Sequence, residues 1–126
     1  MINVRIITPT EIAFEGAVKE IRAPGYHGEL GVLDGHERFL SVSTPGRFTI
    51  FGDDERTWVV GAGFLEVGAD SVTLLTDLCE PVGAVGVEQA MADLKAAEEN
   101  LVTLQAGSVL WTEAERIAAI SRARIG

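Results

Sequence analysis

Turn-forming residues interrupt roughly the first 82 residues of this chain about every 8–12 positions, which constrains the fold more than any other feature. Between them lie short runs rich in β-branched and aromatic residues, such as INVRIIT, GRFTIFG and VTLLTD. In GRFTIFG, Phe48 and Ile50 fall on one face of a strand. Strands and helices do not alternate here, which disfavours a parallel α/β sheet. The pattern predicts an antiparallel β-sandwich or barrel.

The pattern changes after Pro81. Residues 87–105 contain no proline or glycine, and their apolar side chains recur at spacings of three and four, which predicts a helix with one apolar stripe. A second helix is predicted from Thr112, where a hydroxyl precedes Glu115 as in a capping box, to about Arg124. The stripe of the first helix is Val87, Ala90, Met91, Leu94, Ala97, Leu101 and Leu104, and that of the second is Ala114, Ile117, Ala118 and Ile125.

These two patterns predict an α+β chain with a β-sandwich domain at residues 1–84 and an antiparallel two-helix hairpin at residues 85–126. A hairpin this small cannot bury both apolar stripes by itself. We therefore expect it to lie on the β-sandwich or on another protein.

Composition narrows the classes of function. The formal net charge of -9 argues against binding to nucleic acid or to anionic lipid through bulk electrostatics. Cys79 is the only cysteine, so an intrachain disulfide is excluded, and we expect it to be a buried structural thiol. The first residues lack the basic segment and the apolar run that would predict a secretion signal. No stretch approaches the roughly 20 apolar residues of a membrane span.

Catalytic motifs are weak. The run GAGFLEVG lacks the lysine and the following helix of a phosphate-binding loop, and no serine lies in a nucleophile elbow. A metal-dependent enzyme is one alternative, because potential ligands gather in one region, although their spacing fits no metal motif. These ligands are His27, Glu29, Asp34, His36 and Glu37.

Three motifs carry a resemblance to a known family. The run GELGVL at residues 28–33 is followed in register by Gly35-His36, Pro45-Gly46 precedes RFTI, and residues 62–67 read AGFLEV. In this order and spacing, over nearly the whole chain, the sequence resembles the epsilon subunit of F-type ATP synthases, which is called delta in mitochondria.

The resemblance implies a β-sandwich of about ten strands followed by the helical hairpin, in a non-catalytic subunit of the central stalk. It implies contacts with the gamma subunit and the ring of c subunits, and contacts of the hairpin with the alpha and beta subunits that inhibit ATP hydrolysis. No cofactor or metal is implied. The expected location is the cytoplasmic face of the bacterial inner membrane, as a peripheral protein.

The resemblance also implies site residues. A c-ring contact is expected at Glu29, Gly31, Asp34, His36, Glu37 and Arg38, after which Phe39 and Leu40 re-enter the core. The family run Pro-Gly-His-Ala-Pro is replaced here by residues 34–38, DGHER, which adds charge and removes both prolines. An inhibitory contact of the second helix is expected at Arg116, Arg122 and Arg124.

Some bacterial relatives bind ATP through an Ile/Leu-Asp-x-x-Arg-Ala run in the first helix. The matching residues 85–90 read VGVEQA, so Gly86 and Gln89 replace the carboxylate and the guanidinium. We therefore expect no ATP binding. A second alternative for the whole chain is an independent ligand- or protein-binding β-sandwich whose open face the helices cover.

Overall fold

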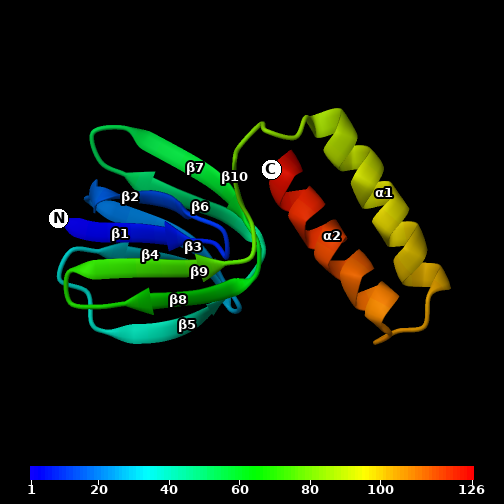
Figure 1. Cartoon of the computed structure of the whole chain (residues 1–126), viewed down its shortest axis with the longest axis horizontal. Helices are drawn as coiled ribbons and strands as arrows, with labels where there is room; N and C mark the ends of the chain where they lie inside the picture. The colour runs from blue at the N-terminus through cyan, green and yellow to red at the C-terminus, as the bar shows by residue number, and fades with distance from the viewer. The chain divides into compact units, whose positions relative to one another are not determined.

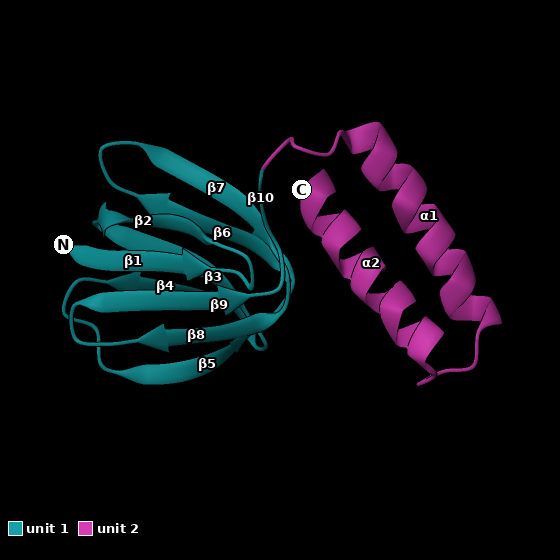
Figure 2. Ribbon diagram, in the orientation of Figure 1, with its two compact units in different colours: residues 1–81 teal, residues 82–126 magenta.

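The computed structural model describes all 126 residues, which divide into two compact units, residues 1–81 and 82–126 (Figure 2). The first unit contains ten strands and the second two helices, which confirms the predicted fold class. The strands are β1 (Ile2–Ile7), β2 (Ile12–Val18), β3 (Glu20–Gly25), β4 (Gly28–Leu33), β5 (Phe39–Ser43), β6 (Gly46–Phe51), β7 (Glu55–Val60), β8 (Gly63–Val67), β9 (Ser71–Thr76) and β10 (Cys79–Pro81). The helices are α1 (Val87–Thr103) and α2 (Val109–Ile125).

The strands form one sheet in the order β10-β7-β6-β3-β5-β8-β9-β1-β2, with β4 paired to β3. The sheet folds over on itself into two layers (Figure 1). β1 and β9 are parallel, an exception to the predicted antiparallel pairing. Because β2 to β8 lie between these two strands in the sequence, no tight hairpin forces them to be antiparallel.

The core lies between the two layers and follows the two-residue period of the strands. In β1, Ile2, Val4 and Ile6 are buried, whereas the side chains between them point outward. Phe48 and Ile50 are also buried, as their alternation predicts. Strand periodicity therefore defines the buried face of the sandwich.

Side chains link β2, at one end of the strand order, to β7, which is next to the strand at the other end. The Phe14 ring of β2 lies 5.1 Å from the Trp58 ring of β7, measured between centroids. The guanidinium of Arg56 lies over both rings, 5.5 Å from the Phe14 centroid and 4.7 Å from the Trp58 centroid. Aromatic and cation–π contacts thus bring the sheet close to a barrel.

The second unit is a helical hairpin (Figure 1), and neither helix is long and apolar enough to span a membrane. The predicted start of the second helix at Thr112 is wrong, because α2 begins at Val109 with Ser108 as its N-cap. The Ser108 hydroxyl accepts a hydrogen bond from the Trp111 backbone N–H, and the Trp111 indole Nε1 donates to the Leu101 carbonyl at 3.2 Å. These two bonds hold the N-terminus of α2 at Ser108, which precedes the start that the capping-box motif predicts.

The two helices meet through small residues, which permit close approach of the backbones. Ala90 and Ala97 of α1 and Ala114 and Ala118 of α2 are buried. Several members of the predicted stripes are exposed, as expected of a hairpin that cannot bury both stripes by itself. These are Val87 and Met91 of α1 and Ile117 of α2. Ser121 instead is fully buried on α2.

Ser121→Ala is expected to stabilise the hairpin. The Ser121 hydroxyl oxygen is buried and has no hydrogen-bond partner. Its removal therefore eliminates a desolvation cost of about 1 kcal/mol that no hydrogen bond offsets. Urea unfolding of the full chain, followed by tryptophan fluorescence, measures the change. Ser108→Ala is the matched control and should destabilise by about 1 kcal/mol, since it removes the N-cap bond. A loss of stability in Ser121→Ala would contradict the prediction.

Candidate partner-binding surfaces

The residues expected to contact a c ring lie on one continuous exposed segment. Two of them belong to β4, which pairs with β3 and with no other strand. The other four lie in the connection from β4 to β5. All six are exposed: Glu29, Gly31, Asp34, His36, Glu37 and Arg38. The structure therefore brings the predicted residues together along one edge of the sheet and the loop that follows it.

A tight turn begins this loop although both family prolines are absent. The His36 backbone N–H donates to the Leu33 carbonyl at 3.2 Å. Gly35 has φ of 81°, a left-handed conformation that favours glycine at the third position of a turn. The His36 ring also packs edge-on against the Phe39 ring, with centroids 5.3 Å apart. Local contacts thus hold the loop in place of the prolines.

The charges of this segment are not equivalent. The Asp34 carboxylate accepts a hydrogen bond from the N-terminal ammonium of Met1 at 2.7 Å, and this bond and its charge lower the pKa of Asp34. Glu29, Glu37 and Arg38 form no ion pair within the chain. These three side chains are therefore the ones whose charge is open to a partner.

The prediction that Leu40 re-enters the core is wrong, because 69% of its surface is exposed. Phe39 is half-buried against the core, as expected. The period of the strand explains the difference, since consecutive residues of β5 point to opposite faces.

The outer face of the sheet carries an apolar row that the sequence analysis did not identify. Strand register places its members directly beside one another across five strands. The apolar row consists of Val42 of β5, Phe64 of β8, Leu75 of β9, Ile7 of β1 and Ile12 of β2. Exposed fractions are 50% for Val42, 52% for Phe64 and 44% for Leu75. A contiguous exposed apolar surface of this kind is typical of a protein interface.

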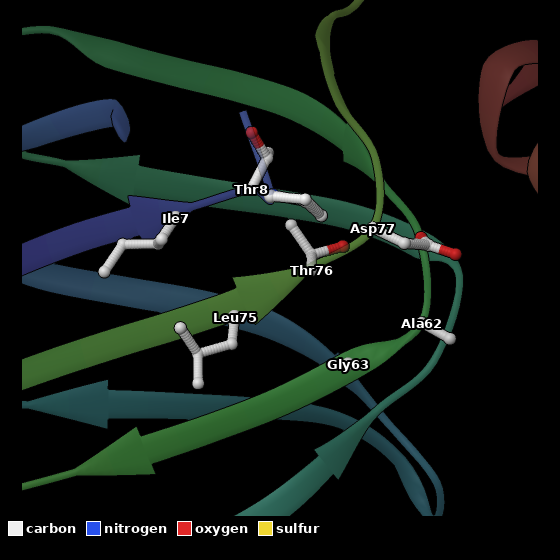
Figure 3. A pocket seen from close by; sticks show the side chains of 8 residues that line it. Ile7, Thr8, Ala62, Gly63, Leu75, Thr76 and Asp77 are labelled. Atoms are coloured by element: carbon white, nitrogen blue, oxygen red, sulfur yellow. The ribbon is translucent and has the colours of Figure 1, made fainter. Parts of the chain in front are cut away.

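A hollow of about 360 Å³ adjoins the row. Figure 3 shows Ile7, Leu75 and Gly63 around it, with Thr76 and Asp77 at the strand ends. Its walls are mainly apolar, and neither a histidine nor a cysteine lines it. The hollow extends the apolar row. Its lining suits insertion of an apolar side chain from a partner and supplies no catalytic group.

The metal-dependent alternative fails on geometry. His27 immediately precedes β4 and His36 follows it, so a strand of six residues, roughly 20 Å long, separates the two imidazoles. No three side chains of the His, Cys, Asp and Glu types lie close enough together to hold a metal ion. The ligands gathered by the sequence are therefore spread along one edge of the sheet.

Cys79 should be slow to react with thiol reagents. Partial burial, together with the nearby carboxylates of Glu11 and Glu80, raises the pKa of this thiol from 9.0 to about 11. At pH 8 we expect alkylation by iodoacetamide to be about 100-fold slower than for an ordinary cysteine, because the thiolate is the reactive form. The rate should rise about tenfold per pH unit. The urea-unfolded chain is the control, and equal rates in the folded and unfolded chains would contradict this prediction.

Comparison with known proteins identifies the family. Residues 1–82 match the family described as "ATP synthase, Delta/Epsilon chain, beta-sandwich domain". The ATP synthase epsilon chain of Myxococcus xanthus (strain DK1622) is 32% identical over 126 residues, which cover 99% of this chain and 93% of the relative. The chain belongs to the ATP synthase delta/epsilon family. The epsilon chain of Anaeromyxobacter sp. (strain K) is 37% identical over 100 residues, which cover 79% of this chain and 76% of the relative.

Solved structures share the fold of this delta/epsilon chain. A chain in the structure of the Euglena gracilis mitochondrial ATP synthase, described as OSCP/F1/c-ring, has a TM-score of 0.86 at 21% identity, covering 97% of this chain and 78% of that one. A chain of the Tetrahymena thermophila mitochondrial ATP synthase central stalk/c-ring has a TM-score of 0.64 at 13% identity, with coverages of 98% and 96%.

Family membership confirms the resemblance seen in the sequence. As an epsilon-type chain, the protein is a non-catalytic subunit of the ATP synthase.

Of the arginines expected to act in inhibition, Arg116 lies near the middle of α2, and Arg122 and Arg124 lie in its last turn. Arg116 pairs with Glu113 of the same helix at 3.3 Å. Arg122 pairs with Glu98 of α1 at 3.6 Å, and Arg124 also interacts within the chain. In this hairpin, therefore, all three arginines have partners inside the chain.

Proposed function

We propose that this delta/epsilon chain is a central-stalk subunit that links rotation of the c ring, through gamma, to ATP synthesis. The observation that carries the proposal is the match to an epsilon chain along 99% of the sequence, which includes both the sandwich and the helices. The solved structures with the same fold come from central-stalk and c-ring assemblies. The relatives in question are bacterial, which supports a place on the cytoplasmic face of the inner membrane.

Two surfaces of the sandwich supply the contacts in this proposal. The apolar row and its hollow bind the gamma subunit, because an exposed apolar surface gains most from a large permanent interface. The charged segment Glu29–Arg38 faces the polar loops of the c ring. Torque then passes through a rigid sheet whose two surfaces bind different subunits.

The helical hairpin restrains ATP hydrolysis through Arg116, Arg122 and Arg124, by contact with the alpha and beta subunits. The basic last turn of α2 supports this part of the proposal. Internal pairs with Glu113 and Glu98 oppose it, since those pairs must open before the arginines reach another subunit. We therefore expect the restraint to be weak.

Glu29→Lys should uncouple the enzyme in part. The Glu29 carboxylate is exposed on an edge strand and has no partner within the chain. Reversal of its charge replaces attraction to a basic c-ring loop by repulsion, and we expect a two- to tenfold loss of ion-driven ATP synthesis, roughly 0.4–1.4 kcal/mol. Synthesis by reconstituted vesicles measures this loss. Asp53→Lys, on the β6–β7 turn, is the control. Synthesis at the parent level in Glu29→Lys would contradict the assignment.

Reconstitution tests the proposed function as a whole. Vesicles carrying ATP synthase from which this chain has been removed should show little ion-driven ATP synthesis. Addition of the purified full chain should restore it. Failure to restore synthesis, with all the other subunits shown to be present, would overturn the proposal.

A further inference from the structure

The motif GFLEV in β8 has two outward side chains, and the family match alone assigns them no role. Phe64 belongs to the apolar row, and Glu66 lies two residues further along the same face. We propose that Glu66 is a recognition residue for the gamma subunit, and that the element of gamma lying on this face is an amphipathic helix. The helix places its apolar stripe on the row and a basic side chain against Glu66. This inference rests on the proposed function.

The outer face is ordered in rows that run across the strands. Beside the apolar row, strand register aligns a second row of Leu40, Glu66, Thr73, Arg5 and Glu15. The surface is therefore apolar along one row and, apart from Leu40, polar along the next. A partner that matches both rows must itself be amphipathic.

Glu66 is the unpaired charge of the second row. Arg5 and Glu15 neutralise each other at 2.9 Å. The Glu66 side chain is exposed, forms no hydrogen bond or ion pair within the chain, and faces Leu40 across the strand pair. A carboxylate at the margin of an apolar contact attracts a cation and selects partners by charge.

The direction from which a cation approaches is also defined. Arg38 lies diagonally across from Glu66, on the side away from Phe64, since Phe39 pairs with Val67 and Leu40 with Glu66. A basic side chain of the partner that approached Glu66 from that side would be repelled by the Arg38 guanidinium. The partner cation therefore approaches Glu66 from the side of Phe64, where the apolar row lies.

The row favours a helix over an added strand. β8, β9 and β1 each pair with a strand on both sides, so no backbone edge is open there. The partner must bind through side chains. Neighbouring strands lie about 4.8 Å apart, close to the 5.4 Å pitch of a helix. One turn of helix per strand can thus set apolar side chains against Val42, Phe64 and Leu75.

Affinity measurements test the recognition residue. Binding of the full chain to purified gamma subunit is measured by calorimetry at several salt concentrations. Glu66→Gln should weaken binding about five- to tenfold and flatten its salt dependence, and Glu66→Lys should weaken it at least 50-fold. Glu55→Gln removes an exposed charge from β7 and should change neither quantity. Affinity and salt dependence of Glu66→Gln equal to the parent would overturn the assignment.

Hydrogen exchange of gamma tests the partner element. Bound chain should protect a helical segment of gamma with apolar residues at spacings of three and four and a flanking lysine or arginine. Reversal of that basic residue to glutamate should recover most of the affinity lost in Glu66→Lys. Protection of an extended segment, or self-association of the chain through this face in place of gamma binding, would overturn the inference. If the parent chain does not bind gamma at all, the proposed function itself fails.

Discussion

Gly63→Ala is expected to unfold the sandwich or to leave it barely stable. A Cβ atom at Gly63 would lie 1.7 Å from the carbonyl oxygen of Leu75 and 2.8 Å from its carbonyl carbon. These are backbone atoms of the neighbouring strand β9, so no side-chain rotation relieves the overlap. β8 and β9 would have to separate at this end of their pairing, where Gly63 lies beside Thr76. We expect a loss of about 3–5 kcal/mol, comparable with the whole stability of many small domains.

Urea unfolding monitored by circular dichroism measures this effect. Gly31→Ala is the matched control, because its nearest neighbour is 3.9 Å from the added Cβ, an ordinary van der Waals distance. It should change stability by less than about 0.5 kcal/mol. A free energy of unfolding for Gly63→Ala within 1 kcal/mol of the parent, on the order of a typical surface change, would show that the two strands do not approach as described.

Phe64→Asp is expected to abolish binding to gamma while the chain stays folded. Phe64 is the aromatic member of the apolar row and is 52% exposed, so the aspartate remains in water when the chain is free. In the complex the carboxylate would be buried without a partner. We expect the affinity to fall by a factor of about 100 or more, the size of effect seen at central aromatic residues of interfaces.

The experiment separates binding from folding. Circular dichroism and the urea midpoint should match those of the parent chain. Leu33→Asp introduces the same charge at a side chain of β4 that is 60% exposed and lies outside the row, and it should bind gamma normally. Parent-like affinity of Phe64→Asp would remove the apolar row from the interface.

Local pattern is sufficient to predict most of the fold. Glycine and proline mark the strand ends, because few other residues adopt tight turns, and the absence of both from residues 87–105 predicts a helix there. The error at the start of α2 has a physical cause. Ser108 and Thr112 both offer a capping hydroxyl, and the choice depends on the Trp111 indole, which bonds to a carbonyl ten residues earlier.

The proposed binding surfaces are less completely predictable from the sequence. Segment Glu29–Arg38 is continuous in sequence, so the motif alone predicts that its residues lie together on the surface. The apolar row unites residues from strands that lie far apart in the chain, such as Ile7 and Leu75, and it depends on a parallel pairing that no hairpin signal indicates. Alternation within β5, β8 and β9 does mark Val42, Phe64 and Leu75 as outward, which is the signal that a sequence reading could have used.

Capture of the full chain from the native membrane fraction tests the central claim most directly, namely that the protein acts through other subunits of the ATP synthase. Gamma and c subunits should be recovered in fixed ratio to the parent chain and be absent when Phe64→Asp is captured in the same way. Recovery of the parent chain alone, as a monomer free of ATP synthase subunits, would contradict the account.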